Sequence, residues 1–292
     1  MVNPSLMTLD LQALTARPVA DCTADEIVTA FARGFENYIV PLRFTPQAYE
    51  RRFRSEDLDP YASRVWLRDG EPLGLLLLAR RGWTSRVAGM GFAPEVRGQG
   101  LGRQALLETI REARERSERT LLLEVIEQNT PAVRLYAGLG FQTTRRLLGY
   151  RRDAGAAPVG TDPLEEIDPL DFARTAAREG ERDLPWMLAP ETLSAATWPA
   201  RAFRLGEHAY ALIADPAAER LALTGLVVPR EHRRQGWGTR LVRALDAAFP
   251  GRPWSVSPVV PEDLAPGFFP SLGWGGWEIN QLEMRLELEL GR

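Results

Sequence analysis

The sequence contains no lysine, a single cysteine and only two histidines in its 292 residues. All 36 basic residues are therefore arginines, which indicates a bacterial-like composition bias of the genome rather than a binding device. Because Cys22 stands alone, no intramolecular disulfide can form, and this fits a reducing cytoplasm. Together with His208 and His232 it makes no Cys/His-rich zinc pattern, so we expect no metal cofactor.

Long apolar runs and an excess of one charge are also missing. The longest apolar run, Leu73–Ala79, is far too short to cross a bilayer. The N-terminus lacks the basic start and apolar core of a signal peptide. We therefore expect a cytoplasmic protein without a membrane partner. The net charge of −3 gives no reason to expect nucleic acid as a partner either.

What the chain does have is a repeat. The segment Asp69–Leu78 resembles Leu205–Ala214, and Gly89–Gly102 resembles Gly225–Gly238. The offset of 136 residues (238 minus 102) is constant over the whole stretch, so no gap interrupts it. The pattern indicates a tandem duplication of a unit of about 140 residues, a common domain size.

The two copies fix the expected domain boundaries. Further along, Tyr136–Phe141 aligns with Phe269–Trp274, so the order of the motifs is kept in both halves. We expect an N-terminal domain over residues 1–153 and a C-terminal domain over 164–292. Residues 154–163, rich in Ala, Gly and Pro, are the expected linker.

Each half is expected to be α+β. Apolar spacing predicts helices at 25–35, 101–116 and after Asn129, and Thr45 with Pro46 predicts the start of another that reaches about residue 54. Strands are expected at 64–67, 73–80, 86–92, 120–126 and 281–290. Glu and Arg pairs are expected on the outer face of the helix at 101–116.

Three glycines, Gly98, Gly100 and Gly102, stand between a strand and a helix. A helix N-terminus has unpaired N–H groups and a positive dipole end, and glycines let a phosphate touch the main chain. Arg97 and Arg103 flank the loop and can add charge-assisted bonds. The simpler alternative is a tight turn with a helix cap, which a second copy of the loop in the same place makes less attractive.

Two other phosphate-binding motifs fit the sequence less well. The chain has no Walker G-x-x-x-x-G-K-[ST] sequence. Gly100–Ala105 does satisfy the dinucleotide pattern G-x-G-x-x-A, with Glu124 at about the right distance. Against a dinucleotide site, the motif lies in mid-domain, the second copy breaks the pattern at its last position, and Ser257 replaces the acidic residue.

Two segments resemble the GNAT superfamily of N-acetyltransferases. Arg97–Gly102 and Arg233–Gly238 both fit that family's acetyl-CoA loop, [R/Q]-x-x-G-x-[G/A]. Leu121–Phe141 is similar to the following motif, with Asn129 and Tyr136 spaced as in the family. The resemblance covers most of both halves.

The resemblance implies two tandem domains, each with a mixed, mostly antiparallel sheet whose central strands splay apart, flanked by helices. It implies acetyl-CoA as co-substrate, with its pyrophosphate on the loop and its pantetheine along the preceding strand. In the first half the expected coenzyme-binding residues are Met90, Gly91, Phe92, Arg97, Gly98, Gln99, Gly100, Leu101, Gly102, Arg103 and Asn129. In the second half they are Val228, Arg233, Arg234, Gln235, Gly236, Trp237, Gly238 and Thr239.

The resemblance also implies Tyr136 as general acid for the leaving thiolate. Glu124 is our candidate for the general base that keeps the attacking amine neutral. Packing beneath the sheet for Tyr136 and ion pairing on a strand for Glu124 are the structural alternatives. Glu36 and Glu71 stay open as other bases.

The second half departs from this pattern, since Phe269, Ser257 and Glu262 stand where the first half has Tyr136, Glu124 and Asn129. Phenylalanine has no proton to donate. We therefore expect the N-terminal half to be catalytic. The C-terminal half is then a degenerate partner that walls the acceptor cleft and can still hold a coenzyme.

These expectations add up to an N-acetyltransferase that modifies the amine of a small molecule or peptide. A non-catalytic acyl-CoA sensor and a transferase of longer acyl groups are the alternatives. Arg43, Arg51 and Arg52 would favour an acidic acceptor, unless they only solvate an amphipathic helix. The chain is expected to be a monomer whose two domains imitate a dimer, or a homodimer.

Overall fold

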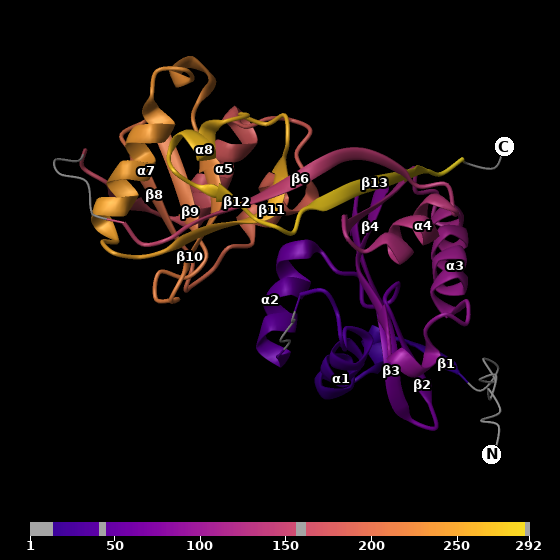
Figure 1. Cartoon of the computed structure of the whole chain (residues 1–292). Coiled ribbons are helices and arrows are strands. Elements are labelled where there is room, and N and C mark those ends of the chain that lie inside the picture. The colour runs from indigo at the N-terminus through magenta and orange to yellow at the C-terminus, as the bar shows by residue number, and fades with distance from the viewer. Residues whose placement is uncertain (1–13, 41–44, 156–161, 290–292) are drawn as a thin grey trace. The chain divides into compact units, whose positions relative to one another are not determined.

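The computed structural model describes residues 14–40, 45–155 and 162–289, and these form two compact units (Figure 1). The first unit comprises Met1–Glu124, Asn129–Gln142 and Met284–Arg292, and the second comprises Val125–Gln128 and Thr143–Glu283. Most of the predicted linker, residues 156–161, lies outside the described residues.

The first unit is built from β1 (Thr15–Pro18), β2 (Arg64–Arg68), β3 (Glu71–Arg81), β4 (Thr84–Phe92), β5 (Thr120–Ile126), α1 (Ala24–Gly34), α2 (Pro46–Glu56), α3 (Leu101–Glu115) and α4 (Thr130–Ala137). Its strands follow the order β1-β2-β3-β4-β5. All pairs are antiparallel except β4 with β5, which is parallel.

The second unit contains β6 (Gln142–Arg152), β7 (Glu165–Ile167), β8 (Arg201–Leu205), β9 (Ala209–Ile213), β10 (Leu221–Val227), β11 (Trp254–Pro261), β12 (Gly275–Gly276), α5 (Pro169–Glu179), α6 (Pro190–Ser194), α7 (Trp237–Ala248) and α8 (Phe268–Ser271). Its strand order is β6-β11-β10-β9-β8-β7, with β12 paired to β6. The last strand, β13 (Gln281–Glu287), begins in the second unit and ends in the first. The predicted α+β class, mostly antiparallel and splayed, is confirmed.

Local sequence signals place the helix ends. Thr45 accepts a hydrogen bond from the N–H of Ala48 at 3.1 Å and Pro46 opens α2, as the N-cap pattern predicts. Thr23 and Glu26 form a capping box at the start of α1. The predicted helices and strands are all present, with ends shifted by a few residues at most.

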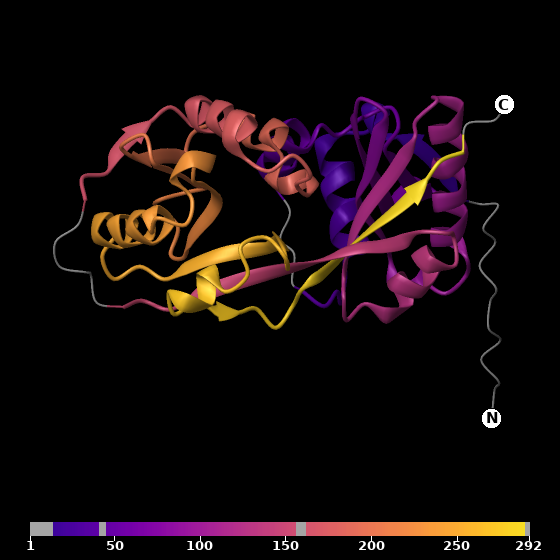
Figure 2. The same ribbon diagram turned by 90° about the horizontal axis from the view of Figure 1, so that it is seen from above.

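Helices cover both faces of the first unit's sheet. Figure 2 shows α1 and α2 on one side of its strands and α3 and α4 on the other. A strand buried on both faces has no polar alternation, and this explains the apolar run in β3, where Leu73–Ala79 includes Leu75, Leu77 and Leu78 with no exposed surface.

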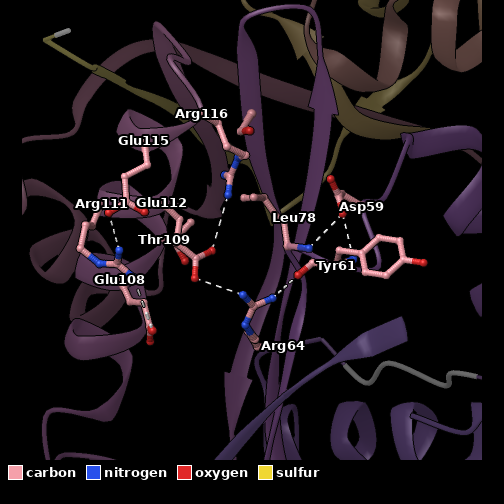
Figure 3. Close-up of polar contacts among 12 residues, drawn as sticks. Asp59, Tyr61, Arg64, Leu78, Glu108, Thr109, Arg111, Glu112, Glu115 and Arg116 are labelled. Carbon is pink, nitrogen blue, oxygen red and sulfur yellow. Dashed lines mark hydrogen bonds and ion pairs between the residues drawn. The ribbon is translucent and has the colours of Figure 1, made fainter. Parts of the chain in front are cut away.

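Ion pairs join α3 to the sheet and decorate its outer face (Figure 3). Arg64 of β2 reaches Glu112 of α3 at 3.1 Å, and Arg116 pairs with the same carboxylate at 3.5 Å. Arg111 bonds Glu115 at 2.5 Å on the solvent side. The Glu and Arg pairs expected on this helix are confirmed, although exposed pairs of this kind contribute only about 0.3–0.5 kcal/mol each.

The second unit has a core on each face of its sheet. One core joins alternate residues of β8 and β9, such as Phe203 and Ile213, to Leu241 and Leu245 of α7. The other joins the intervening residues, such as Tyr210 and Leu212, to α5 and α6. Because side chains alternate between the two faces of a strand, successive residues of β8 and β9 pack in two separate cores.

The closing strands are exchanged between the two halves of the sequence. Strand β6, from the first half, pairs with β11 in the second unit, with Tyr150 opposite Val256. Buried Leu288, near the C-terminus, donates its N–H to the carbonyl of Arg119 in the first unit at 2.8 Å. The boundaries 1–153 and 164–292 describe the repeat in the sequence and stay a prediction, while the compact units differ from them by this exchange.

Candidate active site

The loop after β4 has the shape that its glycines allow. A short 3-10 turn, Pro94–Val96, leads into Gly98 and Gly100, whose φ angles are +73° and +88°. Gly100 is the N-cap of α3, and a Cβ added there would meet nothing within 4 Å. The N–H groups of Leu101, Gly102 and Arg103 therefore open α3 without a side-chain cap, in front of open space, as an anion site requires.

Arg97 holds this loop from behind. Its Nε donates to the carbonyl of Phe92 at 2.6 Å, and its Nη2 donates to the carbonyls of Glu36 at 2.7 Å and Gly34 at 3.2 Å. The guanidinium thus ties the loop to the strand before it and to the end of α1. Its expected contact with a phosphate stays a prediction, since these three carbonyls already occupy donors of the side chain.

The second unit repeats the loop almost group for group. Arg233 donates to the carbonyls of Val228 at 3.0 Å and Glu179 at 2.8 Å, and Gly236 caps α7 at a φ of +82°. The side-chain amides of Gln99 and Gln235 both donate to a carbonyl four residues upstream. The conspicuous difference is Arg234, which adopts a φ of +61° where the first copy has Gly98.

Both units have a splay beside this loop. Strands β4 and β5 pair from Thr84 opposite Thr120 to Val87 opposite Leu123, where the paired register ends. Strands β10 and β11 pair only at Leu221 and Ala222. Beyond the splay, Met90, Gly91 and Phe92 still pair with β3 along one edge, so the other edge of β4 is open to an extended ligand.

A β-bulge marks each splay. In β4 the register shifts between Val87 and Gly89, which leaves Ala88 as the extra residue. In β10 the corresponding shift leaves Thr224. Bulges re-aim a strand, so the repeated bulge explains why the central strands separate at the same point in both units.

Tyr136 lies in α4 next to the loop. The neighbouring Leu135 contacts the first turn of α3, with its Cδ2 3.6 Å from the position of a Cβ on Gly102. Burial, followed by the nearby phenol of Tyr38, raises the pKa of Tyr136 well above its ordinary value. The phenol is protonated at neutral pH, as tyrosine ordinarily is, and burial makes it a weaker acid than a phenol in water.

Asn129 caps α4, accepting the N–H of Ala132 at 3.4 Å through its Oδ1. Burial raises the pKa of Tyr38, in the turn after α1, and the nearby side chain of Asn129 opposes this shift.

Glu124 belongs to a buried chain of charges. Its Oε2 accepts the Nε of Arg86 at 2.7 Å, and the Nη1 of Arg86 donates to Glu56 of α2 at 2.6 Å. Glu56 also pairs with Arg52, which donates in addition to the carbonyl of Ala88 at the bulge. Ion pairing was the structural alternative for Glu124, and the role of base stays a prediction.

The three arginines expected to favour an acidic acceptor differ in their surroundings. Arg52 is committed to Glu56 and the bulge, Arg51 is exposed on α2, and Arg43 lies outside the described residues. Counterparts of the catalytic candidates in the second unit carry no comparable chemistry. Phe269 stacks on Tyr150 with ring centroids 4.7 Å apart, and Ser257 is exposed.

The described residues contain neither a membrane-spanning helix nor a cluster of metal-ligating side chains. No helix among them is long and apolar enough to cross a membrane. Within the same ranges, no group of three or more His, Cys, Asp or Glu side chains is placed to hold a metal ion.

An open helix N-terminus beside a splayed pair of parallel strands is therefore present in both units. Comparison with known proteins agrees: residues 26–141 match the model of the acetyltransferase (GNAT) family. The first half of the chain therefore carries a GNAT domain, and the whole chain has the fold of tandem GNAT proteins.

Several solved structures share that fold. A tandem GNAT protein from the clavulanic acid biosynthesis pathway is 19% identical, with a TM-score of 0.65, over 96% of this chain and 100% of that one. A GCN5-related N-acetyltransferase from Sphaerobacter thermophilus is 16% identical, with a TM-score of 0.68, over 96% and 97% of the two chains.

The proteins most similar in sequence that are described below are both named mycothiol acetyltransferase. The mycothiol acetyltransferase of Acidothermus cellulolyticus is 29% identical over 174 residues, which are 54% of this chain and 53% of that protein. That of Thermobifida fusca is 40% identical over 86 residues, covering 30% and 23%. The chain thus spans about half or less of the length of these relatives.

Proposed function

We propose that the protein is an acetyl-CoA-dependent N-acetyltransferase whose reaction takes place in the first unit. The observation that carries the proposal is the junction of three features there: the open N-terminus of α3, the free edge of β4 at Met90–Phe92, and the buried, protonated phenol of Tyr136. The match to the acetyltransferase family supports the same reading.

In this proposal the main chain binds the coenzyme. The N–H groups from Gln99 to Arg103 face the pyrophosphate, and the helix dipole adds positive potential. The open edge of β4 offers N–H and C=O groups to the amides of the pantetheine. No side chain fills the space at Gly98 and Gly100, so the fit needs no rearrangement of the loop.

The transfer has two proton requirements. An amine with a pKa near 10.4 costs roughly 4–5 kcal/mol to neutralise at pH 7, so a base or a water chain accelerates its attack on the thioester. The departing sulfur needs a proton, which Tyr136 supplies. Glu124, the ion-pair partner of Arg86, accepts the proton of the amine, directly or through water.

The second unit binds a coenzyme without transferring its acyl group in this proposal. Its loop, bulge and arginine contacts match those of the first unit, while Phe269 replaces the donor. The alternative function is a pure acyl-CoA sensor. It would require the first unit, too, to bind a coenzyme without transferring its acyl group, although Tyr136 and Asn129 are both present there.

The acceptor is proposed from the relatives alone. Their name, mycothiol acetyltransferase, makes the unacetylated form of mycothiol the first amine to test, before other small molecules and peptides. We further propose that the protein is a monomer, because one chain already holds two copies of the fold. We also propose that it is cytoplasmic. Light scattering separates the monomer from a homodimer.

The deciding experiment is an amine-panel assay with thiol release as the readout. We expect amine-dependent thiol release from acetyl-CoA in one-to-one stoichiometry with acetylated product. Acetyl-CoA binding in calorimetry without turnover on any amine would favour the sensor. Longer acyl-CoAs in the same assay test the third alternative, the transferase of longer acyl groups.

A further inference from the structure

The point where β4 and β5 separate is the fork of the first unit. Val87 and Leu123 form the last pair of the parallel register. The next residue of β4 is Ala88, the extra residue of the bulge, and the next residue of β5 is Glu124. The fork therefore places the bulged backbone of β4 and a carboxylate of β5 at the same level of the sheet.

Three further charged side chains connect these two positions. Nη2 of Arg52 donates to the carbonyl of Ala88, and Nε of Arg52 donates to Glu56. Nη1 of Arg86 donates to Glu56 at 2.6 Å, and its Nε donates to Glu124 at 2.7 Å. The contacts start at the bulge in β4, pass through α2 and end on β5, so α2 is tied to both branches of the fork.

Arg52 is the member of this chain of contacts that solvent can reach. Its side chain is 24% exposed, whereas those of Glu56, Arg86 and Glu124 are at most 7% exposed. The guanidinium lies beside the residue that follows the bulge, because a Cβ on Gly89 would be 3.8 Å from Nη1 and 3.9 Å from Nη2. A planar guanidinium can hold a carbonyl and a carboxylate at once with fixed geometry, which an ammonium group cannot do.

The fork is also the inner end of the path proposed for the coenzyme. Because the proposed pyrophosphate site is the loop after Phe92, the pantetheine runs back along the open edge of β4 toward Gly89. The four residues from Phe92 back to Ala88 span roughly 13 Å of strand. The thioester end of the coenzyme then comes to the fork, where Glu124, the proposed base, also stands.

We infer that Arg52 is a positioning residue for the acetyl transfer. By holding the carbonyl of Ala88 to Glu56, it fixes the bend of β4 against β5 and so sets where the thioester stands relative to the base. The inference rests on the proposed function, and it adds a residue that acts through the strand and not on the reacting atoms. A displacement of about 1 Å at the reacting centre can cost about 10²-fold in rate, so such a tie affects turnover.

The second unit has no charge at the matching positions. Pro46 opens α2 and Pro190 opens α6, and this pair aligns the two helices. The residues that match Arg52, Glu56, Arg86 and Glu124 are then Ala196, Ala200, Ala222 and Ser257. Both Ala196 and Ala200 pack against the apolar core between α5 and the sheet. The copy that is proposed to be inactive thus lacks the whole chain of contacts.

The bulge of the second unit is held in another way. Its extra residue, Thr224, donates its hydroxyl to the carbonyl of Leu212 on the neighbouring strand at 3.1 Å. The next residue, Gly225, is buried against Phe172 of α5, whose Cζ would be 2.5 Å from a Cβ at that position. A bulge therefore forms without an arginine, so folding of the strand does not by itself explain Arg52.

The test is Arg52→Ala in the full-length chain, assayed by thiol release from acetyl-CoA with the best amine of the panel. We expect kcat to fall by about 10–100-fold, because the bulge is no longer tied to α2. KM for acetyl-CoA should stay unchanged, because the N–H groups of the coenzyme loop are untouched.

Added guanidinium separates positioning from a general effect on folding. Because solvent reaches the site of Arg52, guanidinium chloride at a non-denaturing concentration should restore part of the kcat of Arg52→Ala. Methylammonium chloride at the same concentration supplies the charge without the planar set of donors, and it should restore little. Arg54→Ala removes an exposed arginine of the same helix, paired with Glu50, and should keep the wild-type kcat without either salt.

The outcomes separate this role from the proposed function. A wild-type protein that releases no thiol with any amine overturns both. With an active wild type, an unchanged kcat or a raised KM for acetyl-CoA in Arg52→Ala overturns the positioning role alone. A loss of kcat that guanidinium does not restore, or that methylammonium restores equally, overturns it as well.

Circular dichroism and thermal unfolding establish that the compared variants are folded. If Arg52→Ala is not, Arg52→Lys takes its place, since it keeps the charge but cannot hold Ala88 and Glu56 together in the same geometry. It should lower kcat without changing KM for acetyl-CoA, and a wild-type kcat would overturn the inference.

Discussion

The two units share the architecture of the glycine loop and differ in the side chains around it. Each has a left-handed glycine at the helix N-cap, a bulge in the preceding strand and an arginine bonded to the carbonyls behind the loop. Only the first has a phenol in the helix that follows the parallel strand. The main-chain geometry of the loop is therefore kept in the second unit although the phenol is not. A conserved loop is no evidence that a unit is catalytic.

The strands that splay differ as well. Arg86 in β4 is buried between Glu56 and Glu124, whereas its counterpart in β10 is Ala222, opposite Ser255 in β11. Buried ion pairs seldom add net stability over an apolar replacement, because desolvation offsets the attraction. The buried charges around Arg86 are thus better explained by the proposed reaction than by folding. The second unit, with Ala222 and Ser255 at the corresponding place, shows that the fold forms without them.

The largest effect is expected from making the first unit like the second. Tyr136→Phe copies Phe269 and removes the donor, so kcat should fall by about 10²–10⁴-fold while the affinity for acetyl-CoA stays constant. Steady-state kinetics and calorimetry measure the two quantities. Phe269→Leu, the matched change in the second unit, should leave kcat unchanged. Full turnover by Tyr136→Phe would show that another group protonates the leaving thiolate.

Glu56→Gln should destabilise the fold by about 3–5 kcal/mol at pH 7, because Arg86 loses one of its buried partners. Burial alone would raise the pKa of Glu56, but Arg52 and Arg86 outweigh it, so the folded pKa lies below the ordinary value. Its contribution is then complete above the unfolded pKa of about 4.3 and is lost as the pH falls through the folded value.

Urea unfolding at pH 7 and below pH 4 measures this difference between Glu56→Gln and wild type, which should shrink in acid. Glu50→Gln, in an exposed pair with Arg54, is the control and should change little. A difference that is independent of pH would show that the carboxylate charge is not what matters at this position.

The coenzyme loops offer a smaller, symmetrical test. Gly100 and Gly236 both have left-handed φ angles, where a side chain costs about 1–2 kcal/mol. Gly100→Ala should weaken one of two coenzyme sites by about tenfold, and Gly236→Ala should weaken the other. Calorimetric titration with acetyl-CoA gives both affinities and stoichiometry. A single site in wild type would restrict binding to one unit.

The smallest effect is expected where the loops differ. Arg234 adopts the left-handed conformation that Gly98 adopts in the first unit. Arg234→Gly should relieve the strain and stabilise the protein by up to about 1 kcal/mol, partly offset by a more flexible unfolded chain. Differential scanning calorimetry would show a Tm increase of about 2–4 °C. The reverse change, Gly98→Arg, should lower it.

Local patterns made much of the fold predictable. The helix from Leu101 and the strand Thr120–Ile126 followed from periodicity, and the loop of Gly98–Gly100 followed from its place between strand and helix. The exchange of β6 and β13 could not be predicted in this way. Alternation shows that a strand has a buried face, but it does not show which distant strand it pairs with.

The site was predictable to the extent that it depends on a motif. Glycine spacing located the loop, but the bonds of Arg97 to the end of α1 depend on tertiary packing. Likewise, Glu124 was recognisable as a carboxylate on a strand, while its partner Arg86 emerged only from the parallel pairing of β4 and β5.

The exchanged closing strands restrict how the gene can change. Deleting residues 164–292 would remove Leu288 from its bond to Arg119, and with it the segment that completes the first unit. Deleting the first half would likewise take β6 away from β11. Neither copy can therefore be deleted without damage to the other, and the survival of the second requires no selection for an activity of its own.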